Sequence, residues 1–158
     1  MPQPTITTPP LLNLTVPATP DRPSVKIRVA HDSRRGVYTT NNLGIEHPVI
    51  AVTPTLLGKM RLGAVRRDAL RSALSEANDE LAGRAPVKSY FRGSNGRAVS
   101  EKVRAEPTLE HLENLAIIYR LARLVGDFPV QSVARSFGLE PVDAQRWVAI
   151  ARKSGSLA

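Results

Sequence analysis

The sequence predicts an α+β protein: a small N-terminal β-hairpin and helical module, followed by an all-α C-terminal domain of three helices. Three observations support this fold class. Apolar and basic residues alternate in VKIRVA, residues 25–30, which is the period of a half-buried strand. Apolar residues recur at helical spacing over 66–81 and over 109–125. Two short helical segments within 129–153 flank Gly138, which favours a tight joint between two helices.

The composition limits the classes of function. The chain has 158 residues, which suits one domain or two very small ones, and a formal net charge of +8. A positive balance of this size favours a polyanionic partner, usually nucleic acid. The absence of cysteine excludes disulfides, thiolate catalysis and cysteine-based zinc sites. No apolar run suits a membrane span and the N-terminus does not have the pattern of a secretory signal, so we expect a cytoplasmic, nucleoid-associated protein without a membrane partner.

Residues 1–24 are predicted to form a disordered or extended Pro/Thr-rich tail. They contain seven of the thirteen prolines, which remove backbone donors and block helix formation. A small apolar cluster lies within the tail, and it consists of Leu11, Leu12, Leu14 and Val16. Two interpretations remain open: the cluster is incidental, or it docks on a protein partner.

Residues 25–83 are predicted to form a small α+β module. The strand at 25–30 is followed by turn residues and by VYTT at 37–40, which favours a hairpin. NNLG at 41–44 is expected to end the second strand, and PVIAVT at 48–53 is a third candidate strand.

Helices are expected after this sheet. Thr53 and Pro54 have the pattern of an N-cap and a first helical residue, so a helix should run from there towards Arg61. A second, amphipathic helix over 66–81 should end at Gly83. The module is a candidate dimerisation unit, which would make the protein a homodimer.

The start of the second helix carries two adjacent arginines, Arg66 and Arg67. This placement opposes the helix dipole, which favours acids at a helix N-terminus. Either the pair binds an anion or it is solvated.

Residues 84–106 are predicted to be a basic linker. The segment 84–104 contains six basic residues and one acid, with a GSNG stretch in its middle. Tyr90 and Phe91 are the only adjacent aromatic residues of the protein. Flexible basic segments with aromatic residues can follow a phosphate backbone or lie in a minor groove, so Arg92 and Arg97 are candidate phosphate contacts. The alternative is a solvated linker without such contacts.

Residues 107–158 are predicted to form the three-helix domain. Thr108 is the expected N-cap of a helix over 109–125, and two shorter helices should cover 130–137 and 141–153. A core of this size is marginal, so Trp147 is expected to be its central packing residue.

The last two helices have the spacing of a helix-turn-helix. Ala134 is small where the helices would cross, Gly138 falls at the turn, and apolar residues surround both. The stretch IYRLARLVGDFPVQSVARSFGL, followed by AQRWVAIARKSG, resembles the C-terminal helix-turn-helix of many small proteins of actinobacteria and their phages. The resemblance covers roughly the last third of the chain and implies a tri-helical DNA-binding domain. The alternative is a three-helix interaction module, because a fold does not fix a function.

A helix that enters the major groove presents its N-terminal residues to the bases. Arg146 would pair with guanine, Gln145 with adenine, and Val142 would contact a thymine methyl. Phosphate contacts would come from the preceding helix and from the end of the last one. These candidates are Gln131, Ser132, Arg135, Arg152 and Lys153.

The start of the last helix departs from the family pattern. Related segments carry Ser, Thr or Arg there, whereas this chain has Glu140, Pro141 and Asp143. Acids repel phosphates, and over 105–158 acids and bases balance, so the positive charge of the protein lies upstream. Our preferred interpretation is that Glu140 and Asp143 cap the helix, with Pro141 as its first residue.

Catalysis has little support in the sequence. The three histidines are scattered without metal-ligand spacing, and no phosphate loop, dinucleotide fingerprint or nucleophile elbow is present. We expect a non-enzymatic double-stranded DNA-binding protein, a transcriptional regulator without cofactor or metal. The first alternative is a protein-interaction adaptor for the transcription machinery or a phage assembly, and the second is a small phage DNA-packaging subunit.

Overall fold

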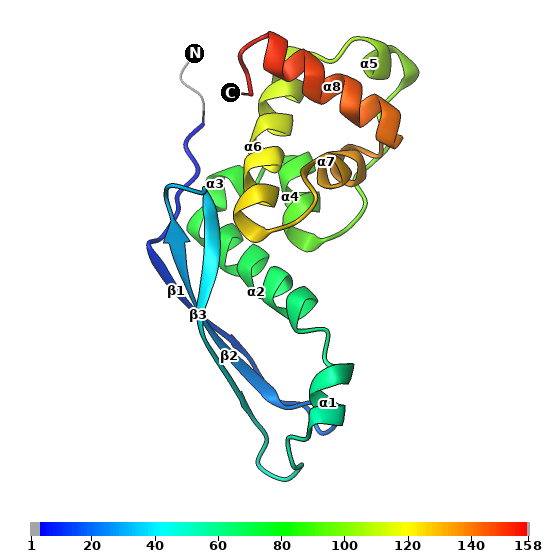
Figure 1. Ribbon diagram of the computed structural model, residues 1–158. Helices are drawn as coiled ribbons and strands as arrows, with labels where there is room; N and C mark the ends of the chain where they lie inside the picture. The colour runs from blue at the N-terminus through cyan, green and yellow to red at the C-terminus, as the bar shows by residue number, and fades with distance from the viewer. Residues whose placement is uncertain (1–3, 158) are drawn as a thin grey trace.

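A three-stranded antiparallel sheet precedes a series of helices, which confirms the mixed α+β class (Figure 1). The computed structural model describes residues 4–157. The strands are β1 (Leu11–Val16), β2 (Ser24–Asp32) and β3 (Val37–Glu46), and β2 is central. Leu14, Ile27 and Leu43 are aligned across the sheet.

Of the two forms expected for residues 1–24, disordered or extended, the structure shows an ordered, extended one in β1, so the disordered form is wrong for Leu11–Val16. The apolar cluster of the tail is this strand, and Leu14 points into the core with 5% of its surface exposed. The segment before β1 is also fixed, because the Asn78 side chain accepts from Thr7 N and donates to Thr7 O. Residues 1–3 lie outside the described part of the chain.

The hairpin of β2 and β3 is confirmed but longer than predicted. NNLG at 41–44 continues β3 instead of ending it. The register shifts there, because Arg28 pairs with Asn42 and Val29 with Thr40, which leaves Asn41 as the extra residue of a β-bulge. The third strand expected at 48–53 is wrong, because this segment has no strand and Val49 is 87% exposed. The Nδ1 atom of His47 accepts from the amides of Val49 and Ile50, which closes a turn and removes these donors from strand pairing.

The next helices are α1 (Pro54–Lys59), α2 (Leu62–Ala77) and α3 (Asp79–Ala82). The start of α1 is as predicted, since the Thr53 hydroxyl accepts from Leu56 N and Pro54 is the first helical residue. The single helix expected over 66–81 is broken at Asn78, whose side-chain amide donates to Leu74 O. The break turns a polar side chain inward, where it is satisfied by backbone groups.

Two helices lie within the predicted linker 84–106, and they are α4 (Ala85–Arg92) and α5 (Glu101–Ala105). The Tyr90 and Phe91 side chains are buried at 5% and 9% exposure, with Val87 beside them at 0%. The aromatic pair therefore belongs to the core, and the expectation of a flexible basic segment is wrong for residues 85–92, which form α4.

The C-terminal helices are α6 (Leu109–Val125), α7 (Pro129–Phe137) and α8 (Pro141–Lys153), close to their predicted bounds. Thr108 caps α6 together with His111, and Gly138 ends α7 with a φ of +59°, where glycine is favoured. Trp147 is fully buried, with ring centroids 5.4 Å from Phe137 and 5.7 Å from His111, which confirms its packing role.

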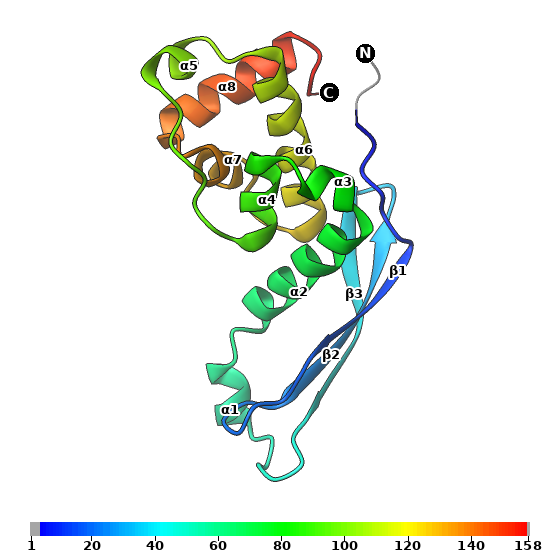
Figure 2. The same ribbon diagram turned by 180° about the vertical axis from the view of Figure 1, so that it is seen from behind.

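One hydrophobic cluster runs from the sheet through α2 and α4 into α6–α8. The division into 1–24, 25–83, 84–106 and 107–158 stays a prediction. Figures 1 and 2 show α6 between α8 and the β2–β3 turn, while α1 lies near the far end of the sheet.

Candidate nucleic-acid interface

Helix α8 has an inner and an outer face. The inner side chains are Ala144, Trp147, Val148 and Ala151, each at most 4% exposed. The sequence-predicted residues of this helix are all exposed on the outer side, and they are Val142, Gln145, Arg146, Arg152 and Lys153. We call these five residues the α8 outer face. Their spacing of three, four and seven residues places them along one flank of the helix.

The first turn of α8 corrects the capping interpretation in part. Pro141 is the first helical residue and Glu140 occupies the N-cap, but the Glu140 side chain makes no capping hydrogen bond. Asp143 lies in the first turn, where the helix dipole favours an acid, and its Oδ1 is 3.1 Å from a guanidinium nitrogen of Arg146. The charge of Asp143, beside the outer face, is therefore partly neutralised by Arg146, a predicted base-reading residue.

Arg146 is tied to the protein although half of its side chain is exposed. Its guanidinium also donates to the backbone carbonyl of Arg104, at the end of α5. The indole nitrogen of Trp147 donates to the same carbonyl at 3.0 Å. Helix α5 is thereby fixed beside α8, and Arg146 must exchange these contacts before its fork can pair with a guanine.

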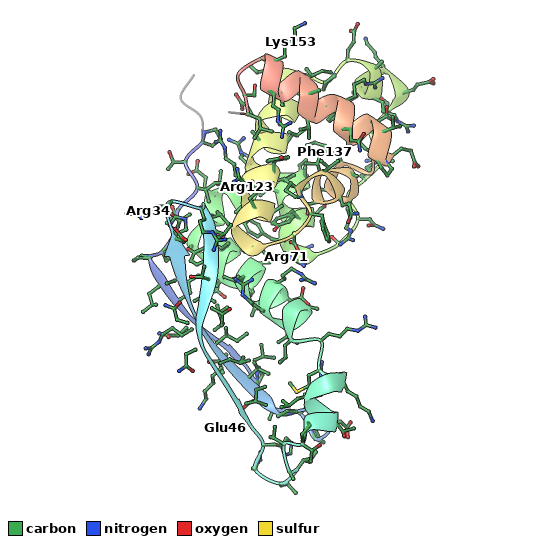
Figure 3. All side chains as sticks on the ribbon, in the orientation of Figure 1. Arg34, Glu46, Arg71, Arg123, Phe137 and Lys153 are labelled. Atoms are coloured by element: carbon green, nitrogen blue, oxygen red, sulfur yellow. The ribbon has the colours of Figure 1, made fainter. Side chains whose placement is uncertain are left out.

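The C-terminal end of the α8 outer face is cationic. Arg152 donates to the Tyr119 hydroxyl at 2.9 Å, and its guanidinium carbon lies 5.7 Å from the Tyr119 ring centroid. Lys153 is exposed beside it, and Figure 3 labels it at the end of α8. Arg152 is oriented by its contact with the Tyr119 ring. Lys153 adds a second positive charge, on a long flexible side chain that can reach a phosphate.

The predicted α7 residues lie elsewhere. Gln131, Ser132 and Arg135 line a cavity of about 190 Å³ between α7, α2 and α4. The other cationic side chains of this cavity are Arg67 and Arg71 of α2. The structure therefore separates the candidate residues of α7 from those of the α8 outer face.

Asp127 organises this cavity. Its carboxylate is 3.3 Å from Arg67 Nε and 3.2 Å from Arg71 Nε, and it accepts a hydrogen bond of 2.9 Å from the Tyr90 hydroxyl. Burial raises the pKa of Tyr90, and the charge and hydrogen bond of Asp127 raise it further. Sequence reasoning missed this cluster, although the i, i+4 spacing of Arg67 and Arg71 places them on one side of a helix.

Arg66 holds three elements together. Its guanidinium donates to Thr40 Oγ1 at 2.9 Å, to Val125 O at 3.0 Å and to Tyr38 O. Burial, followed by the charge of Arg67, lowers the pKa of Arg66. Of the two interpretations of the Arg66 and Arg67 pair, anion binding or solvation, neither fits Arg66, which binds a hydroxyl and two backbone carbonyls. Arg67 binds an anion of the protein itself, the Asp127 carboxylate, and is partly exposed.

Arg92 and Arg97 are exposed, at the last turn of α4 and in the segment after it. That segment is packed against the turn between α7 and α8. Gly96 N donates to Arg135 O at 2.8 Å, and a Cβ atom on Gly96 would lie 1.7 Å from Ser136 O. Arg97 is therefore held on a fixed backbone beside the α7–α8 turn.

Among residues 4–157, no group of three or more histidine and acidic side chains could hold a metal ion. No helix in the same range has the length and apolar character that crossing a bilayer requires. Comparisons with protein-family models, with curated proteins and with solved structures find no match for this chain.

Proposed function

We propose that the protein binds double-stranded DNA through α8 and acts as a non-enzymatic transcriptional regulator. In this proposal α6, α7 and α8 form a tri-helical helix-turn-helix domain with α8 as its recognition helix. The observation that carries the proposal is the α8 outer face, whose five side chains are all exposed and which is cationic at its C-terminal end. The excess of basic residues in the whole chain supports a polyanionic partner.

The dimensions of α8 suit a major groove. Thirteen residues give a helix about 20 Å long, and the major groove of B-DNA, roughly 12 Å wide, admits a helix. Val142 and Gln145 lie in the first half of α8 and are exposed, so these two side chains would contact base edges first. Arg152 and Lys153 at the other end would contact phosphates.

Arg146 has a conditional role in this proposal. Its bonds to Asp143 and to the Arg104 carbonyl are replaced when the guanidinium pairs with guanine. Where the sequence offers no guanine at that position, Arg146 keeps these contacts; where it offers one, the gain from pairing is partly offset by the Asp143 carboxylate left unpaired near DNA. Arg146 would therefore contribute more to sequence selection than to affinity.

Ala149 allows a test without removing any contact, because its side chain is exposed between the two ends of the outer face. We would compare Ala149→Asp with Ala149→Gln in fluorescence anisotropy, using labelled genomic duplexes at several salt concentrations. A new carboxylate opposite the phosphates should lower affinity by roughly tenfold or more, whereas glutamine should change it little. Equal DNA affinity for both variants and the parent protein would contradict the proposal.

An adaptor that binds another protein is the second candidate. Val142 is 70% exposed on the α8 outer face, and residues 105–158 carry no net charge. An exposed apolar anchor with a balanced surface suits a protein partner. Binding to DNA that is absent, or that hardly depends on salt, would favour this candidate, because several phosphate contacts cause a steep salt dependence.

The proposed regulator is a homodimer, because one recognition helix reads few base pairs and two-fold dimers read two half-sites. The module before α4 would supply the dimer contact. Light scattering with size-exclusion chromatography measures the mass directly, and a monomer at the concentrations that bind DNA would remove this part of the proposal.

A further inference from the structure

Four arginines converge at a surface that neither α8 nor α7 contributes to. The turn between β2 and β3, residues 33–36, lies near the exposed side of α6. Residues of the turn and of α6 line a cavity of about 380 Å³. Its arginines are Arg34 and Arg35 of the turn and Arg120 and Arg123 of α6. We call these four residues the turn arginine site. Figure 3 labels Arg34 and Arg123, which lie on facing parts of the turn and α6.

The turn is built so that its own acid does not neutralise these arginines. Asp32 Oδ1 accepts from the backbone amides of Arg34 and Arg35, at 3.0 and 3.2 Å. Gly36 N donates to Asp32 O at 2.8 Å, and Gly36 has a φ of +64°. The carboxylate of Asp32 thus fixes the backbone, while the two side chains extend from a rigid turn.

Among the described residues 4–157, no acidic side chain lines this cavity. Within residues 4–157, no carboxylate lies within 4.0 Å of the guanidinium groups of Arg34, Arg35 or Arg123. Like charges held close together repel, and a concave surface lined by one sign of charge concentrates counterions. The turn arginine site is therefore an anion-attracting surface at neutral pH.

The rest of the cavity suits a ligand that is more than a bare ion. Thr8 and Ser33 supply hydroxyl groups, while Ile6 and Leu124 form an apolar part of the lining. Arginine forks bind phosphate oxygens in pairs, and hydroxyls donate to the same oxygens. The apolar part can contact a sugar or a base attached to the phosphate.

We propose that the turn arginine site binds phosphate groups. The phosphate has two possible carriers, the backbone of a duplex or a free oligophosphate such as the phosphate chain of a nucleotide. Because α6 separates this site from α8, the site is distinct from the α8 outer face (Figures 1 and 2). The inference does not depend on the proposed recognition role of α8.

The test uses the full chain with the double substitution Arg34→Ala/Arg35→Ala. Arg22→Ala/Lys59→Ala is the matched control, because it removes the same charge from exposed positions outside the site. The probes are inorganic tripolyphosphate, measured by calorimetry, and a labelled 20-base-pair duplex, measured by anisotropy. Loss of two charge-assisted contacts should weaken at least one probe by roughly tenfold or more, while the control stays near the parent protein.

The two carriers give different results. A loss confined to tripolyphosphate identifies a free oligophosphate, and a loss for the duplex, with a salt slope reduced by about 2, identifies a DNA backbone. A loss for both probes identifies a phosphate site that accepts either carrier. Arg123→Glu, which leaves the turn intact, should reproduce the loss in each case.

Unchanged binding of both probes by both variants would overturn the inference. Failure of the α8 proposal is distinguishable from this result, because Ala149→Asp should leave tripolyphosphate binding unchanged. Circular dichroism of each variant establishes that the fold is retained before binding is measured.

Discussion

Two arginine-rich regions of this molecule use the same side chain in opposite ways. At the junction of α2, α4 and α7, Arg67 and Arg71 are paired with Asp127, which also binds the Tyr90 hydroxyl. At the turn arginine site, no carboxylate of residues 4–157 lies within 4.0 Å of the guanidinium groups of Arg34, Arg35 or Arg123. The junction uses positive charge to hold helices together, whereas the turn exposes it to solvent. Net charge alone therefore overstates how many arginines are available to a partner.

The junction also shows why adjacent arginines can be needed inside a small protein. Arg66 satisfies the carbonyl of Val125 at the end of α6 and the carbonyl of Tyr38 in β3. Buried carbonyls without donors are costly, and a planar fork can serve two elements at once. A lysine in place of Arg66 has a single side-chain nitrogen, so at least one of these two carbonyls would lose its hydrogen-bond donor.

The largest effect on the free energy of unfolding should come from raising the pH. The helical core and its border with the sheet contain buried tyrosines, whereas the β2–β3 turn contains none. Burial raises the pKa of Tyr38 to about 12, and the pKa of Tyr90 is also raised. In the unfolded chain both ionise near pH 10, so stability is complete below pH 10 and falls as the pH rises towards the folded pKa. The limiting slope is about 1.4 kcal/mol per pH unit for each tyrosine.

Urea unfolding at pH 9 to 11.5 would measure this slope. Tyr38→Phe should flatten the loss, because it removes a buried group that ionises more readily in the unfolded chain. A free energy of unfolding that is constant up to pH 11 would show that the buried tyrosines do not control alkaline stability.

Asp127→Asn should destabilise the junction by about 2–3 kcal/mol, because Arg71, with 14% of its side chain exposed, loses its buried counter-charge. This loss is smaller than for a fully buried ion pair, because the Arg67 side chain is 39% exposed and solvent screens its charge. Chemical denaturation gives the number. Asp68→Asn is the control, because the Asp68 carboxylate is 70% exposed and its loss should cost under about 0.5 kcal/mol.

Arg66→Lys should cost about 1–2 kcal/mol, since one ammonium group cannot reach the three oxygens that the guanidinium serves. The measurement is the same denaturation series, with hydrogen exchange of β3 and the end of α6 as a local readout. A lysine variant as stable as the parent protein would show that water replaces the lost contacts.

The smallest change in stability is expected at the turn. Arg34→Ala/Arg35→Ala removes two exposed side chains that have no carboxylate within 4.0 Å among residues 4–157, so stability should stay within about 0.5 kcal/mol or rise slightly. A loss above about 1 kcal/mol would mean that these arginines support the fold, and the contrast between the two regions would fail.

Local patterns in the sequence predicted the elements that depend on nearby residues. The hairpin, the Thr53 and Thr108 caps and the bounds of α6 to α8 follow from periodicity, N-caps and glycines within a few positions. β1 was missed because its pairing with β2 outweighs a proline-rich context. The prediction of a strand at 48–53 was wrong because the His47 side chain accepts hydrogen bonds from two backbone amides of this segment.

The candidate site was predicted less completely than the fold. Exposure of Val142 and Gln145 follows from helical periodicity once α8 is placed. The hydrogen bond from Arg146 to the carbonyl of Arg104 joins residues 42 positions apart, so no local pattern in the sequence predicts it. The same holds for Asp127, which meets Arg67 and Arg71 only after α6 has reversed the chain direction, so pairing between distant charges requires the fold.

The close approach of Gly96 to Ser136 and of Gly138 to Ala98 affects how this protein can be divided for experiments. A Cβ atom at Gly138 would lie 2.6 Å from Ala98 Cα, so two stretches of main chain touch where the last helices meet. A fragment that starts at Pro107 loses this stretch together with the carbonyl that receives the Trp147 indole proton. Expression of the three C-terminal helices alone should therefore begin near Ser94, and shorter fragments should unfold at lower temperature.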